Sequence, residues 1–241
     1  MILWPGIFFC SILQPFTEHI LNPILMDIAS FIDHTILRPD CTTDDIKKIC
    51  SEAVEHHFYS VCVPPFYVRD AVRILENTSV KVATVVGFPM GYSPTVAKVE
   101  EMKRAIDQGT DELDVVINIC AVKNQDWNYL RNDIYSMTTA AHIKGKIIKV
   151  IIETGLLTEE EISKVCELCT EVKPDFVKTS TGYNGVGASL DSVRLMRKIL
   201  GKNIQIKASG GIRDRETALQ MINAGAKRIG SSSGIKMVTD S

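Results

Sequence analysis

Two lysines stand at the ends of short apolar segments in the second half of the chain. Lys178 closes Asp-Phe-Val-Lys before small hydroxyl residues and a glycine, and Lys207 has the same place in Ile-Gln-Ile-Lys. Such segments predict buried strands that end in turns. Burial of an ammonium group is costly and favours the neutral amine, which is a nucleophile toward carbonyl groups. For either lysine alone, a side chain that reaches the surface from a strand end is the competing interpretation.

The two lysines together favour Schiff-base chemistry. Neighbouring strands would bring both ammonium groups close to each other, and like charges disfavour protonation of both. A free lysine is neutral in roughly one molecule in 2,500 at pH 7, and lowering its pKa to about 7 requires about 4–5 kcal/mol. Burial and a neighbouring cation can supply that bias. We therefore predict one lysine as the nucleophile and the other as the perturbing charge, with two independent surface lysines as the alternative.

Other polar residues occur within the predicted strands. Asp114 is flanked by apolar residues, so it either faces the interior or is satisfied by a local hydrogen bond; beside the lysines it would stay ionised and relay protons. Asp33 shows a weaker version of this pattern, and Lys149 is a possible third interior cation. His34 should point away from Asp33 by strand alternation, which favours a structural role. Cys62 is expected to face the core or line a pocket.

Glycine-rich turns follow the last three predicted strands. They contain Gly182, the pair Gly210 and Gly211, and Gly230 followed by Ser231-Ser-Ser-Gly. Glycines let backbone N–H groups approach an anion, and a following helix adds a favourable dipole. Each turn alone is weak evidence, but turns that meet at one place favour a phosphomonoester site.

The elements that must position these residues alternate regularly. Eight short strands that alternate with helical patterns, of which the last is short, predict an α/β protein with a single-domain (β/α)8 barrel, also called a TIM barrel. A doubly wound open sheet is the runner-up, but only a barrel makes the ends of the last three strands neighbours at one mouth. The predicted strands span residues 30–35, 60–63, 80–86, 112–117, 147–152, 175–179, 204–208 and 228–230. The predicted helices span residues 43–57, 64–75, 95–108, 126–144, 158–172, 189–200 and 213–224.

Composition narrows the class of partner. The 241 residues are 45% hydrophobic, with 27 basic and 29 acidic side chains and no long basic run, which argues against nucleic acid or a membrane surface as the main partner. Seven cysteines without a disulfide pattern predict reduced thiols in a cytoplasmic protein. Cys166 and Cys169 form a C-x-x-C inside a helical pattern, which favours a structural role over a redox or zinc role.

Residues 1–25 differ from the rest of the chain. Met1–Leu13 is apolar but interrupted by Pro5 and Gly6 and too short to span a bilayer, and the segment lacks the basic start of a secretory signal. We expect either a docking extension or translation from an upstream start codon. The domain itself is predicted over residues 26–241.

The ordered motifs of residues 26–238 resemble deoxyribose-phosphate aldolase, a class I aldolase family with the barrel fold. Seven segments carry the resemblance: Phe-Ile-Asp-His-Thr-Ile-Leu, Val-Gly-Phe-Pro-Met-Gly, Glu-Leu-Asp-Val-Val-Ile-Asn, Lys-Val-Ile-Ile-Glu-Thr, Phe-Val-Lys-Thr-Ser-Thr-Gly, Lys-Ala-Ser-Gly-Gly-Ile-Arg and Arg-Ile-Gly-Ser-Ser-Ser-Gly.

The resemblance implies reversible cleavage of 2-deoxy-D-ribose 5-phosphate to D-glyceraldehyde 3-phosphate and acetaldehyde, without metal or organic cofactor, in a homo-oligomer (dimer or tetramer). It implies that Lys178 is the Schiff-base nucleophile, Lys207 the lysine that tunes it and Asp114 the proton-relay acid/base. Positions expected to bind the sugar or its phosphate are Asp33, Lys149, Thr181, Gly182, Gly210, Gly211, Gly230, Ser231 and Ser232.

The chain also departs from the family pattern. Tyr183 stands where some members have lysine or phenylalanine, and the C-terminus lacks a tyrosine-bearing tail that some members fold over the site. The rival functions are a phosphosugar isomerase, which would need a carboxylate base instead of paired lysines, an aldolase for another sugar, and a phosphometabolite-binding protein without activity.

Overall fold

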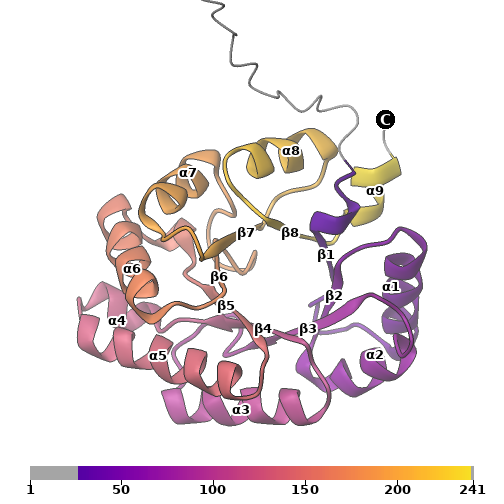
Figure 1. The fold of residues 1–241 in the computed structure, drawn as a ribbon, viewed down its shortest axis with the longest axis horizontal. Helices are drawn as coiled ribbons and strands as arrows, with labels where there is room; N and C mark the ends of the chain where they lie inside the picture. Colours follow the sequence, from indigo (N-terminus) through magenta and orange to yellow (C-terminus); the bar gives the residue numbers. More distant parts are fainter. Residues whose placement is uncertain (1–26, 240–241) are drawn as a thin grey trace, which may run out of the picture.

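The computed structural model describes residues 27–239 and contains one closed sheet of eight parallel strands in chain order (Figure 1). The predicted (β/α)8 barrel is therefore confirmed. Each strand pairs with the next in the chain, and the last strand pairs with the first. The strands are β1 Ile32–Thr35, β2 Ser60–Val63, β3 Lys81–Val86, β4 Glu112–Val116, β5 Ile147–Ile151, β6 Phe176–Lys178, β7 Gln205–Ser209 and β8 Arg228–Ser231.

Helices surround the barrel and connect the strands (Figure 1). The α-helices are α1 Thr43–Glu55, α2 Val68–Ile74, α3 Thr95–Asp107, α4 Ile119–Lys123, α5 Trp127–Ile143, α6 Glu159–Val172, α7 Leu190–Ile199, α8 Arg215–Asn223 and α9 Gly234–Thr239. The 3-10 turns are η1 Ala29–Phe31, η2 Pro65–Tyr67 and η3 Thr154–Leu156. Within residues 27–239, no helix is both long and apolar enough to cross a membrane.

Local sequence explains where the helices begin. Thr42 caps α1 by accepting a hydrogen bond from the backbone of Asp45, whose side chain bonds back to the backbone of Thr42. Thr158 and Glu161 form the same reciprocal box at the start of α6. These caps satisfy backbone donors that the first turn of a helix leaves free.

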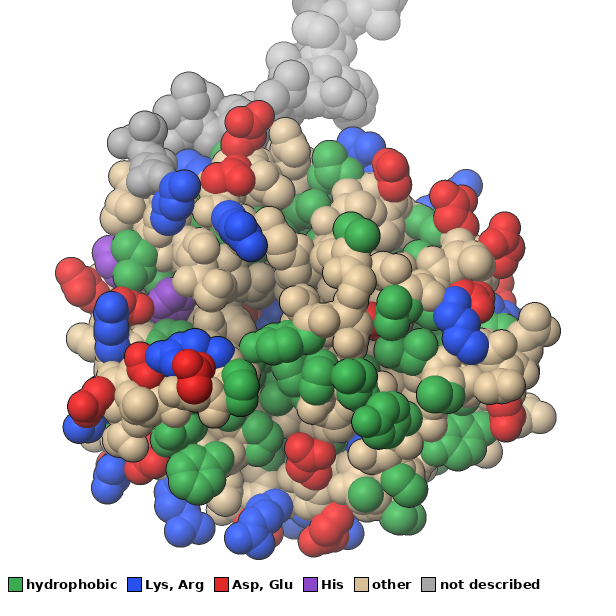
Figure 2. Space-filling model, turned by 180° about the vertical axis from the view of Figure 1, so that it is seen from behind, with side chains coloured by type: hydrophobic (Ala, Val, Ile, Leu, Met, Phe, Trp, Pro, Cys, Tyr) green, Lys and Arg blue, Asp and Glu red, His purple; other side chains and the backbone are tan. Residues whose placement is uncertain are grey.

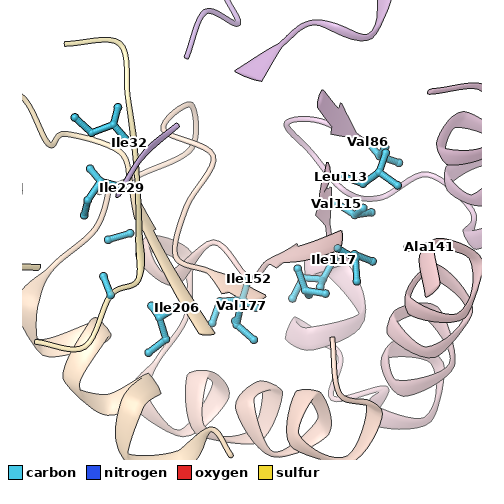
Figure 3. Packing of buried hydrophobic residues seen from close by; sticks show 14 of the residues in the cluster. Ile32, Val86, Leu113, Val115, Ile117, Ala141, Ile152, Val177, Ile206 and Ile229 are labelled. Carbon is cyan, nitrogen blue, oxygen red and sulfur yellow. The ribbon is translucent and has the colours of Figure 1, made fainter. Parts of the chain in front are cut away.

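Alternation along the strands separates two buried environments. Apolar side chains of the strands, such as Val115, Val177 and Ile206, belong to a hydrophobic cluster shared with the surrounding helices, part of which is shown in Figure 3. The intervening residues point into the barrel, where β4 to β8 contribute the buried charged side chains Glu112, Asp114, Lys149, Lys178, Lys207 and Arg228. Because successive strand residues point to opposite faces, one strand serves both the core and the interior.

The structure corrects several predicted boundaries. Residues 30–31 belong to the 3-10 turn η1, so the first strand begins only at Ile32. The predicted helix at 64–75 is divided into η2 and α2, because the two prolines open it as a 3-10 turn. Helix α4 was not predicted, and the segment 1–25 lies outside the described residues.

Candidate active site

The paired strands β6 and β7 bring Lys178 and Lys207 together. Their Cα atoms are register partners, and both side chains are almost completely buried. Both Nζ atoms donate to the same carboxylate oxygen, Oδ2 of Asp114, each at 2.7 Å. The two nitrogens are therefore separated by no more than twice that distance, as the sequence pattern predicted.

Asp114 is the centre of this arrangement. Its other oxygen, Oδ1, accepts a hydrogen bond of 2.7 Å from Lys149, so three lysines surround one carboxylate. Burial alone would raise the pKa of Asp114, but the three ammonium groups outweigh it and hold the pKa well below its usual range. Asp114 is thus an ionised acceptor in contact with both strand-end lysines.

Asp33 forms a second acidic centre, which shares Lys207 and Lys149 with Asp114. Its Oδ2 accepts from Lys207 at 2.5 Å and lies 3.6 Å from Lys149, while its Oδ1 accepts from Ser60 at 2.6 Å and from Arg228 at 2.7 Å. Despite complete burial, these cations hold the pKa of Asp33 below its ordinary value.

Glu112 and Arg228 complete the interior, and we did not predict either of them. Nη1 of Arg228 lies 3.1 Å from Oε2 of Glu112, and the same oxygen is 2.6 Å from Nζ of Lys149. The guanidinium lies 3.4 Å from the centre of the Tyr59 ring. Strand alternation could have identified Glu112, because it is two residues before Asp114 on the same face of β4.

The two strand-end lysines have opposite pKa shifts. Burial is the largest influence on Lys178 and lowers its pKa; Asp114 opposes this shift and Lys207 adds to it. Burial acts in the same direction on Lys207, but Asp114 and Asp33 outweigh it, so its pKa is raised. Lys178 is therefore the lysine that becomes a neutral amine more readily, and Lys207 is the one that remains an ammonium.

A cavity of about 900 Å³ opens above Lys178. In Figure 1 the strands follow one another clockwise. Because the connections between parallel strands are right-handed, the amino ends of the strands face the viewer in that figure. Figure 2 shows the molecule from behind and therefore looks onto the carboxyl ends. Asp114, Lys207, Lys149 and Asp33 are not among the residues that line the cavity and lie below it. The predicted positions that do line it are Lys178, Thr181, Gly182, Gly210, Gly211, Gly230, Ser231 and Ser232.

Two of the glycines are required by close packing. Gly210 has a φ of +90°, and a Cβ there would lie 2.9 Å from the Cα of Gly187. A Cβ on Gly230 would lie 3.0 Å from Cε of Lys207 and 2.9 Å from Cβ of Ser209. The turns after β6 and β7 thus pack backbone against backbone, and Gly230 leaves the space that the Lys207 side chain occupies.

Glu153 braces the turn that follows Lys178, and we did not predict this role. It has left-handed backbone geometry and is fully buried after β5. Its carboxylate accepts hydrogen bonds from N–H and O–H of Thr181 and from the side-chain amide of Asn184. The same amide also donates to the carbonyl of Pro89, so Glu153 connects the turns after β3, β5 and β6.

The remaining predicted residues have simpler environments. His34 is buried and hydrogen-bonded to Glu52 of α1 at 2.8 Å, as expected of a structural histidine, although it also lines the cavity. Cys62 packs inside the barrel with Ala83 and Val85, and burial raises the pKa of its thiol to about 11. Cys166 and Cys169 are buried thiols within α6. In the described part of the chain, no group of three or more His, Cys, Asp or Glu residues is arranged to hold a metal.

Comparison with known proteins agrees with this geometry. The sequence profile of the DeoC/LacD family of aldolases matches residues 28–238. This chain belongs to the DeoC/LacD family. A deoxyribose-phosphate aldolase of Thermococcus kodakarensis is 54% identical over 88% of this chain and 96% of that protein.

Further DeoC/LacD relatives cover the same region. A deoxyribose-phosphate aldolase of Clostridium tetani is 50% identical over 90% of this chain and all of that protein. The solved structure of a tetrameric deoxyribose phosphate aldolase from Aeropyrum pernix superposes with a TM-score of 0.83 at 30% identity, over 90% of this chain and 91% of that one. The DeoC/LacD match over residues 28–238 therefore spans every strand of the barrel and the positions of the predicted site residues.

Proposed function

We propose that this chain is a deoxyribose-phosphate aldolase that reversibly cleaves 2-deoxy-D-ribose 5-phosphate to D-glyceraldehyde 3-phosphate and acetaldehyde. The observation that carries the proposal is the pair of buried lysines on one Asp114 oxygen, the more easily deprotonated of which opens into the cavity. The names of the Thermococcus and Clostridium relatives support the same activity.

The reaction begins at Lys178. Its neutral amine attacks the C1 aldehyde of the open-chain sugar, and loss of water gives an iminium ion. The iminium accepts the electron pair of the C2–C3 bond as that bond breaks, and the C3 hydroxyl loses its proton through water held by Asp114 and Lys207. Glyceraldehyde 3-phosphate departs, and the remaining enamine on Lys178 is protonated at C2 and hydrolysed to acetaldehyde.

Asp114 and Lys207 form the proton relay in this scheme. Lys207 remains an ammonium between Asp114 and Asp33, so it can donate a proton while its positive charge disfavours protonation of Lys178. Asp33 and Lys149 hold the two relay groups from below the cavity. We assign them to the polar support of the site, because each is hydrogen-bonded to one of the relay groups.

The phosphate is assigned to the glycine-rich turns at the mouth of the barrel. Gly182, Gly210 and Gly211 all have positive φ values and line the cavity together with Ser231 and Ser232. Backbone N–H groups in such turns are suited to a small anion. Thr181 is held by Glu153 next to these turns. This arrangement supports recognition of a sugar phosphate at the end of the cavity away from Asp114.

Borohydride trapping tests the proposal. The protein is incubated with acetaldehyde, reduced, digested and mapped by mass spectrometry. An aldolase gains a two-carbon adduct on Lys178, whereas an isomerase or a phosphometabolite-binding protein gains none at that position. Turnover of 2-deoxy-D-ribose 5-phosphate then distinguishes this substrate from other sugars. An adduct on Lys207 but none on Lys178 would reverse the two roles.

We also propose a cytoplasmic homo-oligomer. The described cysteines are all free thiols, which supports a reducing compartment. The Aeropyrum pernix relative is a tetramer, hydrophobic side chains gather on the lower half of the face in Figure 2, and Phe66, Tyr92 and Val96 are exposed hydrophobic residues of the chain. Light scattering after size-exclusion chromatography tests this assembly, and a monomer at micromolar concentration would refute it.

A further inference from the structure

The amino end of the barrel interior holds two charged residues that the proposed reaction does not use. Glu112 and Arg228 are both buried, and Nη1 of Arg228 lies 3.1 Å from Oε2 of Glu112. Neither lines the cavity. A hydrophobic residue would fill this space without the cost of burying two ions, so the pair calls for a further explanation.

The charges of the ion-paired groups around Lys178 balance only when Lys178 is neutral; Glu153, which interacts with Lys178 from outside this cluster, is hydrogen-bonded to Thr181. The carboxylates are Asp33, Glu112 and Asp114, and the remaining cations are Lys149, Lys207 and Arg228. Three negative charges thus face three positive charges, and a proton on Lys178 would leave one positive charge in excess. An unbalanced charge in a buried site is costly, so this balance favours the free amine.

Glu112 and Arg228 reach Lys178 through shared partners. Arg228 donates to Oδ1 of Asp33, whose Oδ2 accepts from Lys207. Glu112 contacts Lys149, which donates to Oδ1 of Asp114. Lys207 and Asp114 are the charged residues with the largest influence on the pKa of Lys178, so each distant residue acts on one neighbour of the nucleophile.

We infer that Glu112 and Arg228 are positioning residues that set the protonation of Lys178 by holding the net charge of the interior near zero. The inference rests on the proposed role of Lys178 in Schiff-base formation. Loss of the Arg228 charge makes the cluster more negative and favours a proton on Lys178. Loss of the Glu112 charge makes it more positive and favours the free amine.

Charged and titratable groups from several elements surround the pair and Lys178, including Cys62 of β2 and Glu153 after β5, which both interact electrostatically with Lys178. Asp33 comes from β1, Asp114 from β4, Lys149 from β5 and Lys207 from β7. Tyr59, before β2, lies beneath the guanidinium of Arg228, and the Phe176 ring centre is 5.2 Å from it. Oε1 of Glu112 has no hydrogen-bond partner among the described residues, so the carboxylate is held by its two cations through one oxygen.

The test measures the rate of Lys178 adduct formation with acetaldehyde between pH 5 and 10, with borohydride quenching. The neutral amine reacts, so the rate rises with pH through the pKa of Lys178. A unit charge acting across roughly 10 Å of protein shifts a pKa by about one unit. The midpoint should move up by about one pH unit in Arg228→Met and down by about one in Glu112→Gln.

Control variants separate charge from structure. The double variant Glu112→Gln/Arg228→Met should return the midpoint toward wild type, and Arg228→Lys, which keeps the charge, should leave it in place. Lys98→Met removes a buried cation outside the barrel and should not move it. Glu112→Gln preserves the shape of the side chain, so it provides a result even if Arg228→Met does not fold.

Two outcomes overturn the inference. In the first, the pH midpoint stays constant while the rates of adduct formation fall in both single variants, which would indicate that the pair is purely structural. Alternatively, both variants move the midpoint in the same direction. If wild-type protein forms no adduct on Lys178 at any pH, the proposed aldolase function fails, and that result differs from a wild-type adduct whose midpoint the variants do not move.

Discussion

Two of the buried lysines, Lys98 and Lys178, have surroundings that differ in an instructive way. Nζ of Lys98 in α3 donates to the carbonyls of Gly91 and Val116 and to Asp133, which satisfies all three of its hydrogens. The hydrogen bond of Lys178 in the described structure is the one to Asp114, a carboxylate that it shares with Lys207 and Lys149. One lysine therefore has a complete set of acceptors, and the other competes for its acceptor.

The difference shows what makes a buried lysine reactive. Lys98 and Asp133 form a one-to-one pair without exposed surface, which compensates for the burial of both charges. Lys178 is in a cluster where cations outnumber carboxylates once it is protonated, and it lines the cavity. Burial alone does not distinguish the two residues. The number of acceptors and the local charge balance do, and the following experiments test that distinction.

Lys178→Leu should have the largest effect on activity. Without the amine, turnover of 2-deoxy-D-ribose 5-phosphate should fall by roughly 10⁵-fold or more, toward the uncatalysed rate. The melting temperature should stay the same or rise, because removal of an incompletely paired buried amine relieves a desolvation cost. Stopped assays and calorimetry measure the two effects, and residual activity near wild type would remove Lys178 from the mechanism.

Asp114→Leu should lower turnover less than Lys178→Leu. The loss of a positioned acid/base group costs roughly 10²–10⁴-fold in rate, and here the loss also leaves the amino groups of three lysines without their shared acceptor. Asp114→Asn keeps the shape and removes the charge, so it serves as the matched variant. A near-normal rate in both variants would exclude the proton relay.

Lys98→Met should lower stability and preserve the reaction at Lys178, which is the opposite of the effect expected for Lys178→Leu. It leaves Asp133 as an unpaired buried carboxylate, which should lower the free energy of unfolding by about 3–5 kcal/mol. The variant that folds should still form the acetaldehyde adduct on Lys178. Urea denaturation measures the stability, with Lys103→Met on the exposed surface of α3 as the control. Loss of the adduct in well-folded protein would contradict the division between the two lysines.

Glu153→Gln should have the smallest effect and should act on substrate affinity. A glutamine keeps the shape but loses the charge that accepts from Thr181 and Asn184, so the turn before Gly182 should loosen. The KM for the phosphorylated sugar should rise by about tenfold, the equivalent of one charge-assisted hydrogen bond. The KM for unphosphorylated 2-deoxyribose should change less. An equal rise for both sugars would show that the turn does not serve the phosphate.

The sequence was informative wherever chemistry follows from alternation and strand order. The order of the eight strands follows from the alternation of apolar segments with helical patterns. The pairing of Lys178 with Lys207 follows from two consecutive apolar segments that each end at a lysine. Arg228 was missed because it stands at the first position of its strand, where a basic side chain ordinarily turns to solvent. Glu153 depends on a left-handed backbone conformation that no spacing indicates. The DeoC/LacD match is to whole segments, so it does not identify such residues individually.

The packing around Gly230 has a consequence for engineering the substrate range of this enzyme. A methyl group at that position would press against the Lys207 side chain, so libraries that vary Gly230 would mostly yield inactive clones. Tyr183 lines the same cavity, is half exposed and packs edge-on against Phe88. It can be exchanged without disturbing the lysines, which makes it the better starting point for aldehydes bulkier than the natural one.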